Sequence, residues 1–189
     1  MNIIYHERGK VFHLFNDSIS YIFMVLPHGG LGSLYYGKAL RDRAGFEHLF
    51  ERVHRGMSAC VFADCRDYSL DAIRQELPTY GSSDFRRPAL NVLQENGSRI
   101  LDMQYTGFRI VDGKPKLAGL PATYVESDDE AKTLIVEVMD ALTGLRAELL
   151  YTIFVEGGAI ARSVCYINDG TEVLHLQKVM SMSIDLPDT

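Results

Sequence analysis

The residues best placed for chemistry lie in an irregular stretch of the chain, from Glu76 to Leu90. Two prolines and a glycine interrupt this stretch, so it predicts neither a regular helix nor a regular strand. Asp84 and Arg86 stand two residues apart and project to the same side if the chain is extended there, whereas Phe85 points away toward a core. Such a carboxylate and guanidinium can clasp each other or jointly face a polyhydroxylated ligand.

A second candidate is the glycine-rich segment from His28 to Gly32, which has the composition of oxyanion holes and phosphate-binding loops. Those sites require a helix or a nucleophile elbow immediately afterwards, and here Leu34-Tyr35-Tyr36 continues as a strand without any G-x-S-x-G motif. The segment therefore predicts a hairpin loop.

Ligands at the short, fixed spacings of a metal site are not evident. Of the six histidines, only His48 and His54 come close, six residues apart. Cys60, Cys65 and Cys165 are an odd number without a disulfide-like or zinc-like framework, which predicts free thiols and fits a reducing compartment. We expect neither a metal site nor a cofactor.

Composition limits the class of protein. With 189 residues, 47% of them hydrophobic and 23% charged, the chain predicts one soluble globular domain over residues 1–189. A formal net charge of −6 provides no positive field to hold nucleic acid. The longest apolar run, Tyr21–Leu26, is only strand length, and no secretory signal precedes it. We expect a cytoplasmic protein without a membrane or nucleic-acid partner.

The elements that must position these residues are strands. In residues 10–26, two apolar runs flank Asn16-Asp17-Ser18, which has the composition of a hairpin turn. Residues 38–55 then carry alternating charge and could hold a short helix, although Gly45 argues against a long one. Little periodicity follows up to residue 88, so residues 38–88 predict an irregular excursion from the sheet.

The second half has a clear strand pattern. Residues 100–110 predict a strand with a possible bulge at Gly107. Three long strands, 133–140, 145–156 and 159–168, are separated by Thr143-Gly144 and Gly157-Gly158, which are two-residue hairpin signals. The last strand is expected at 173–186, with one face formed by Leu174, Leu176, Met180, Met182 and Ile184. The pattern predicts an all-β fold, a large antiparallel two-sheet β-sandwich.

Three segments resemble a known family: LYYGKALRDR at 34–43, YSLDAIRQE at 68–76 and QELPTYGSSDFRRPAL at 75–90. The last follows the order acid, aromatic or Leu, Pro, any residue, Tyr-Gly, two small or polar residues, then Asp-Phe-Arg and Pro-Ala. This order is similar to that in the amino-terminal domain of the family 36 glycoside hydrolases, the bacterial α-galactosidases. The resemblance extends over nearly the whole chain.

The resemblance implies a sandwich of the supersandwich type, forming the amino-terminal part of a longer retaining α-galactosidase. Such an enzyme hydrolyses terminal α-linked galactose in melibiose- or raffinose-type sugars. In the family, the aspartate nucleophile and the aspartate acid/base lie on a (β/α)₈ barrel that follows this domain. Strand–helix alternation of that kind is missing from this sequence, so we assign no catalytic residue and expect the chain alone to be inactive.

The resemblance also implies that the domain packs against the barrel, supports a homotetramer and lends a loop to the rim of the galactoside pocket. Candidate substrate-binding residues lie in the irregular excursion, where a solvated or clasping charge is the alternative role of each. They are Glu51, Arg52, His54, Arg55, Asp84 and Arg86.

Two other functions stay open. An autonomous carbohydrate-binding module needs an exposed row of aromatic rings, and the chain offers ten tyrosines and nine phenylalanines but no tryptophan. A small enzyme such as a sugar mutarotase would pair a histidine acid with a glutamate base. His175 with Glu172 or Glu148 is the nearest choice for that chemistry.

Overall fold

The computed structural model describes residues 1–189 apart from 53–60, 63–64, 71, 83–86, 120–121 and 187–189. Its regular structure is almost entirely β-strand, with two 3₁₀ helices in the described residues, η1 (Glu47–Leu49) and η2 (Asp128–Glu130). None of the helices described could cross a membrane, because they are too short and too polar. The strands are β1 (Asn2–His6), β2 (Val11–Phe15), β3 (Ile19–Val25), β4 (Leu31–Lys38), β5 (Val61–Phe62), β6 (Cys65–Ser69), β7 (Leu90–Gln94), β8 (Met103–Asp112), β9 (Ala131–Asp140), β10 (Leu145–Phe154), β11 (Ile160–Asn168) and β12 (Leu174–Val179).

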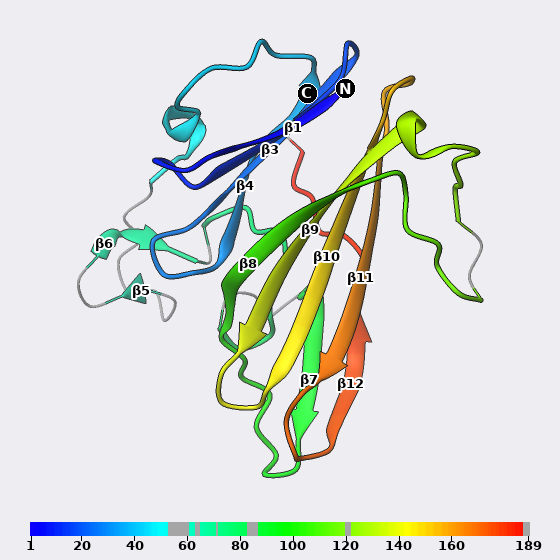
Figure 1. The fold of residues 1–189 in the computed structure, drawn as a ribbon. Coiled ribbons are helices and arrows are strands. Elements are labelled where there is room, and N and C mark those ends of the chain that lie inside the picture. The colour runs from blue at the N-terminus through cyan, green and yellow to red at the C-terminus, as the bar shows by residue number, and fades with distance from the viewer. Residues whose placement is uncertain (53–60, 63–64, 71, 83–86, 120–121, 187–189) are drawn as a thin grey trace.

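Two four-stranded antiparallel sheets form the sandwich (Figure 1). One sheet has the order β1-β2-β3-β4 and the other has the order β11-β10-β9-β8. Two small ribbons extend from them, β12-β7 at the lower end of Figure 1 and β5-β6 at its left. This architecture confirms the predicted all-β sandwich, and the short β5-β6 ribbon lies within the predicted irregular excursion.

The turn between β2 and β3 forms at Asn16, as the sequence predicts. The Asn16 side-chain oxygen accepts hydrogen bonds from the backbone N–H groups of Ser18 and Ile19, at 2.8 and 2.9 Å. Its amide group donates to the carbonyl oxygens of Phe154 and Gly157, at 2.9 and 2.8 Å. One buried side chain thus closes a hairpin of the first sheet and fastens it to a hairpin of the second.

The three long strands predicted in the second half are present as β9, β10 and β11, and β10 confirms the predicted alternation. Every second residue of β10 from Leu145 to Ile153 is buried. The expected bulge in β8 is present as a register shift between Tyr105 and Gly107. The connections at residues 141–144 and 155–159 are longer than the two-residue turns predicted.

The tips of two hairpins touch each other. A Cβ atom at Gly144 would come within 2.7 Å of the backbone nitrogen of Gly170, and Gly144 has a φ of +73°. Asp169 also donates its backbone N–H to the carbonyl oxygen of Gly144, at 3.0 Å. Glycine is therefore needed in the β9–β10 turn both for its backbone conformation and for the close approach.

The last strand is present, as predicted, but its predicted length and its single apolar face are wrong. β12 ends at Val179, and its register shifts between Leu176 and Lys178, so the alternation of faces is lost. Leu176 and Met180 are about half exposed, whereas Met182 packs against the core beyond the strand. The physical reason is that β12 pairs with β7 alone, and this five-residue partner supports only a short ladder.

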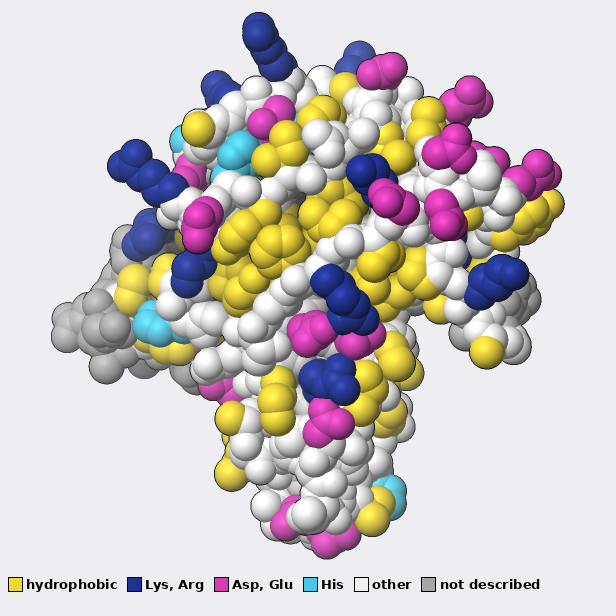
Figure 2. All heavy atoms as spheres, viewed as in Figure 1, with side chains coloured by type: hydrophobic (Ala, Val, Ile, Leu, Met, Phe, Trp, Pro, Cys, Tyr) yellow, Lys and Arg dark blue, Asp and Glu magenta, His cyan; other side chains and the backbone are white. Residues whose placement is uncertain are grey.

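Charged side chains cover the outer face of the β8–β11 sheet, near the centre of Figure 2. Arg109 pairs with Glu137 and, at 3.0 Å, with Glu148. Arg146 pairs with Glu148 at 3.2 Å and with Asp169 at 2.7 Å. This ladder marks the solvent side of the sheet, because exposed ion pairs need no core to stabilise them.

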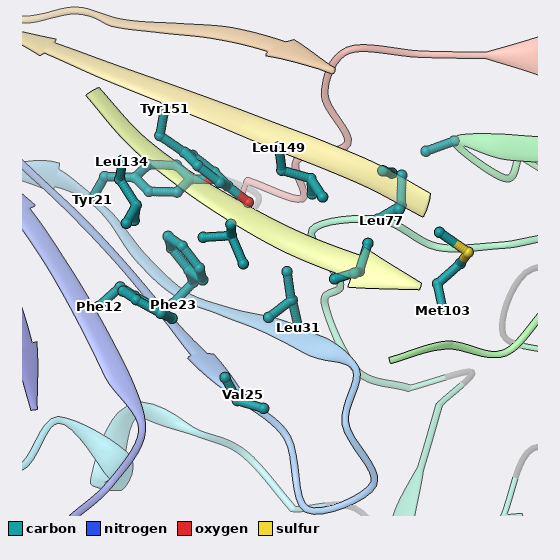
Figure 3. Packing of buried hydrophobic residues seen from close by; sticks show 14 of the residues in the cluster. Phe12, Tyr21, Phe23, Val25, Leu31, Leu77, Met103, Leu134, Leu149 and Tyr151 are labelled. Atoms are coloured by element: carbon teal, nitrogen blue, oxygen red, sulfur yellow. The ribbon is translucent and has the colours of Figure 1, made fainter. Parts of the chain in front are cut away.

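The main core lies between the sheets (Figure 3). Phe12 and Phe23 of the first sheet stack at 4.9 Å, and Phe23 stacks on Tyr151 of the second sheet at 4.7 Å. Leu134 and Leu149 are fully buried beside these rings. The interlocking rings contribute area burial and specific contacts that hold the two sheets in one orientation.

We expect replacement of a central side chain to destabilise the domain strongly. Leu134→Ala should lower the free energy of unfolding by about 2–5 kcal/mol, because it removes buried area and leaves a cavity. Urea denaturation measures the change. Leu142→Ala is the matched control, since Leu142 is 88% exposed in a turn and its loss should cost less than about 0.5 kcal/mol. Equal effects of the two substitutions would contradict the assigned core.

Candidate functional site

A strap of irregular chain, residues 39–52, packs on the face of the β1–β4 sheet that is turned away from the main core. Phe46 is its anchor, and this side chain is buried with Val11, Ile22 and Leu34 in a second, smaller core. Gly45 precedes it with a φ of +91°, a conformation that favours glycine and that agrees with the predicted limit on helix length. Only the single turn η1 forms there.

A polar chain of hydrogen bonds fixes the start of the strap. The Leu40 N–H donates to the Ser20 hydroxyl oxygen at 2.9 Å, and the Ser20 hydroxyl lies 2.9 Å from His13 Nε2. His13 Nδ1 lies 2.7 Å from Asp42 Oδ1, and His6 Nε2 lies 2.9 Å from the same oxygen. Since Ser20 accepts from Leu40, its own proton can go to His13 Nε2, and His13 then donates from Nδ1 to Asp42.

Ser20, His13 and Asp42 have the connectivity of a hydrolase triad, but they are not one. Ser20 and His13 are fully buried, so no substrate carbonyl can approach the serine oxygen. The same three groups instead satisfy one another and the backbone of the strap. Their function is to position the strap on the sheet.

The pKa values fit this structural role. Burial lowers the pKa of His13, and this effect outweighs the opposing effect of Asp42. Burial also raises the pKa of Asp42, but the hydrogen bonds from His13 and His6 more than compensate, and the net pKa lies below its ordinary value. A neutral His13 beside an ionised Asp42 is the arrangement that the hydrogen-bond chain requires.

The second polar feature is the carboxylate of Glu76, which begins the irregular stretch singled out in the sequence. Only 2% of this residue is exposed. Tyr21 of the first sheet donates to its two oxygens at 2.9 and 2.7 Å, and Tyr151 of the second sheet donates to Oε2 at 3.0 Å. Glu76 therefore bridges the two sheets through its side chain.

The backbone of this stretch is fixed as well. The Glu76 N–H donates to Leu31 O at 3.0 Å, and Ser33 N–H donates to Arg74 O at 2.9 Å, so residues 74–76 pair with the edge of β4. Leu77, Pro78 and Thr79 continue inward and are buried. The first half of the stretch thus has a structural role, whereas the clasp predicted for Asp84 and Arg86 lies outside the described residues.

Desolvation raises the pKa of Glu76, and three hydrogen bonds and the charge of Arg162 oppose that rise. The Arg162 guanidinium carbon lies 4.0 Å from the centre of the Tyr151 ring. Burial raises the pKa of Tyr21 and Tyr151 above the ordinary range. The two tyrosines therefore keep their protons near neutral pH and donate hydrogen bonds to Glu76.

A surface cleft of about 400 Å³ opens between the loop after β3, the start of β8 and β5. His28 and Phe62 stack nearly parallel at 3.6 Å on one side of it. Lys10, Gln104 and Tyr105 also line the cleft. An aromatic face, an ammonium group and an amide together provide the kinds of contact that a sugar uses, namely stacking and hydrogen bonds.

Comparison with known proteins identifies the family. Residues 29–189 match the glycosyl hydrolase family 36 N-terminal domain. The chain belongs to this family.

Relatives of the family 36 domain are α-galactosidases. The chain is 43% identical over 187 residues to α-galactosidase AgaA of Geobacillus stearothermophilus, and the match covers 99% of this chain and 26% of AgaA. It is 38% identical to α-galactosidase Mel36A of Lactobacillus acidophilus, over 98% of this chain and 25% of Mel36A. The chain thus spans about a quarter of the length of these curated relatives.

Solved structures agree with this assignment. The α-galactosidase from Lactobacillus brevis superposes with a TM-score of 0.92 at 35% identity, over 98% of this chain and 25% of that chain. A variant of AgaA in complex with raffinose superposes with a TM-score of 0.88 at 44% identity, over 94% of this chain and 25% of that chain. The fold of the family 36 domain is therefore the fold of this chain.

Two of the six predicted substrate-binding residues can be located. Glu51 and Arg52 lie at the end of the strap, and both are exposed. Arg52 Nη1 lies 4.0 Å from the thiol of Cys65 in β6. His54, Arg55, Asp84 and Arg86 lie outside the described residues, so their predicted role stays a prediction.

Other expectations can be compared with the described part of the family 36 domain. The segment at His28 is a turn between β3 and β4, as predicted for a hairpin loop. Cys65 and Cys165 are free thiols, and Cys60 lies outside the described residues. The described residues contain no cluster of three or more metal-ligating side chains. Glu148 already pairs with Arg109 and Arg146, which does not favour it as a mutarotase base.

Asp42 and the buried role of Glu76 were missed at the sequence level. Asp42 meets His13 only through the β2–β3 pairing and the path of the strap, 29 positions along the chain. A signal was present, because His13 is the one polar residue in the apolar run Val11–Phe15. A buried polar residue in a strand requires a partner.

Removing the Glu76 carboxylate should destabilise the domain. We expect Glu76→Ala to lower the free energy of unfolding by about 3–5 kcal/mol, because the Tyr21 and Tyr151 hydroxyls and the Arg162 charge lose their buried partner. Urea denaturation measures the loss. Glu76→Gln keeps an acceptor oxygen and should cost clearly less. A loss below about 1 kcal/mol for the alanine variant would contradict the bridging role.

The strap should weaken in mild acid. The pKa of His13 is lower in the folded state than its ordinary value, so the unfolded state binds more protons as pH falls below about 6.5. The free energy of unfolding should then decrease from about pH 6.5 downward, and Asp42 should add a further loss only below about pH 4. Chemical denaturation at several pH values measures this dependence.

Two variants isolate the contribution of His13. His13→Gln should be less stable than the wild type at pH 7.5, and the gap should narrow as the pH falls toward 5, because the variant cannot take up the proton. His175→Gln on the exposed face of β12 is the control and should follow the wild type throughout. Parallel curves for wild type and His13→Gln would refute the assignment.

Proposed function

We propose that this chain is the non-catalytic amino-terminal domain of a retaining α-galactosidase that hydrolyses terminal α-linked galactose in melibiose- or raffinose-type sugars. The observation that carries the proposal is the match of 99% of this chain to 26% of the α-galactosidase AgaA. The remaining length of such a protein has room for a catalytic barrel. The raffinose complex of an AgaA variant supports the substrate class.

The chemistry of the described residues supports a non-catalytic role. A retaining glycosidase places two carboxyl groups about 5 Å apart on either side of the scissile bond. The carboxylates with shifted pKa values that could be taken for such a pair are in structural use here: Glu76 is enclosed by two tyrosines, and Asp42 is held by two histidines. In the proposed enzyme, both catalytic aspartates lie on the barrel.

The proposed contribution of the domain is threefold: to support the barrel, to support a homo-oligomer and to complete the rim of the galactoside pocket. For the rim we propose Glu51 and Arg52, together with His54, Arg55, Asp84 and Arg86. The anchored strap supports this proposal, because it presents Glu51 and Arg52 at the surface from a rigid base. A cytoplasmic location is part of the same proposal.

The test compares the 189-residue chain with the full-length protein that contains it. The full-length protein should release galactose from an aryl α-galactoside, and the 189-residue chain should release none above the background of a mock purification. Turnover that copurifies with the short chain through a second chromatographic step would overturn the non-catalytic role. An inactive full-length protein would overturn the α-galactosidase itself.

An autonomous carbohydrate-binding module is the second candidate, and one observation favours it. Phe108 is partly exposed and packs against Tyr5 with ring centres 4.7 Å apart. The two rings are tilted by 50°, so they form a less regular platform than coplanar rings would. Calorimetry of the 189-residue chain with galactose and raffinose decides: binding tighter than about 1 mM, or about 4 kcal/mol, would favour the module.

A further inference from the structure

One side of the main core is only partly covered by the described residues. Tyr105, Phe108 and Ile110 of β8 stand opposite Val138, Val136 and Leu134 of β9, in that order, and those three valine and leucine side chains are buried. Cross-strand partners share a face of the sheet, so the three β8 residues belong to the inner face. Phe108 and Ile110 are nevertheless 36% and 40% exposed.

Phe108 and Ile110 are exposed because the sandwich ends at β1 and β8. β1 and β8 are the edge strands of their sheets, and each pairs on one side only within the described residues. From the opposite sheet, Tyr5 and Phe12 approach the Phe108 ring, at 4.7 and 5.1 Å between ring centres. No further strand of the first sheet lies over Ile110 in the described part of the chain. Figure 2 shows the result as a broad hydrophobic area between the upper sheet and β8.

Nothing on β8 protects this inner side. Natural edge strands are commonly blunted by charges or prolines, or covered by another segment. The charged residue nearest to Phe108 is Arg109, but it points to the outer face and pairs there with Glu137 and Glu148. An exposed aromatic and aliphatic area beside two open strand edges is typical of a surface that another protein segment covers.

We propose that this edge patch, formed by Tyr5, Tyr105, Phe108 and Ile110, is the surface on which the catalytic part of the same polypeptide docks. This proposal rests on the proposed function, and it adds which face of the domain contacts the catalytic part. The chain spans about a quarter of its relatives, so most of such a polypeptide lies outside it. Tyr105 also lines the cleft with His28 and Phe62, which joins the patch to the sugar-compatible surface.

Two exposed apolar areas could serve for docking, the edge patch and one face of β12, and we choose the edge patch because it adjoins the cleft. Leu176 and Val179 of β12 stand opposite the buried Val92 and Leu90 and are also about half exposed. That ribbon lies at the lower end of the molecule in Figure 1, and none of its residues line the cleft. A catalytic part that uses the cleft as the rim of its galactoside pocket must lie beside the edge patch, because Tyr105 belongs to both surfaces.

The experiment uses the full-length protein with p-benzoylphenylalanine at position 108 or 110, irradiated and digested for mass spectrometry. A mixture of ¹⁴N- and ¹⁵N-labelled protein distinguishes cross-links within one chain from those between copies. We expect cross-links within one chain from both positions to residues after 189. Position 142 is the exposed control and should give none, and position 176 tests the competing surface.

Each other outcome overturns the proposal. Cross-links only between differently labelled chains would show that a second copy covers the patch. Cross-links from position 176 but not from 108 or 110 would assign docking to β12. No cross-link at either patch position, together with raffinose binding that Phe108→Ala abolishes, would make the patch a sugar platform. Failure of the proposed function is seen separately, as absence of galactose release by the unlabelled wild-type protein.

A pair of substitutions gives a functional readout. Ile110→Lys in the full-length protein should lower the temperature of half-inactivation, because an ammonium group would be buried at the docked surface. Leu142→Lys should leave that temperature unchanged. To separate docking from folding, the melting temperature of the 189-residue chain should shift little with Ile110→Lys. An unchanged half-inactivation temperature for Ile110→Lys would refute docking at this patch.

Discussion

The carboxylate of Glu76 joins three parts of the domain that the backbone alone does not connect. One tyrosine from each sheet donates to it, and its own backbone pairs with the edge of β4. A buried charge is costly unless its partners are complete, so this arrangement tolerates little variation in the distance between the sheets. The spacing of the sandwich, and with it the stacking of Phe23 on Tyr151, depends on that one group.

The two polar clusters lie on opposite faces of the first sheet, and each fixes a different irregular segment of the chain. On the inner face, Glu76 with Tyr21 fixes the irregular stretch between β6 and β7. On the outer face, Asp42 with His13 and Ser20 fixes the strap. Both clusters use groups that elsewhere act as catalysts, but the Ser20 hydroxyl, the His13 ring and the Glu76 carboxylate are buried away from any substrate. The surface available to a ligand or partner is what remains: the strap end, the cleft and the edge patch.

The sequence predicted the fold better than the site, for physical reasons. β10 was predictable because its two faces have opposite chemistry over ten residues, and only a half-buried strand explains that alternation. β12 was mispredicted because a register shift at Leu176 breaks the alternation, and one sequence does not reveal where a ladder loses its partner. The Asp42 cluster depends on strand register and on a long irregular connection, which local patterns do not encode. The bridging role of Glu76 was also missed, because it depends on the packing of two sheets whose tyrosines lie 55 and 75 positions away along the chain.

The touching hairpin tips at Gly144 and Gly170 have a consequence for how this domain can be varied. Neither turn has room for a side chain, so neither can accept an inserted peptide without separating β9–β10 from β11–β12. Gly157, in the turn before β11, has open space for a side chain, but its carbonyl oxygen is held by Asn16. Among homologues, insertions should therefore be absent from the two touching turns, and the Gly157 turn should accept changes of side chain more readily than changes of length.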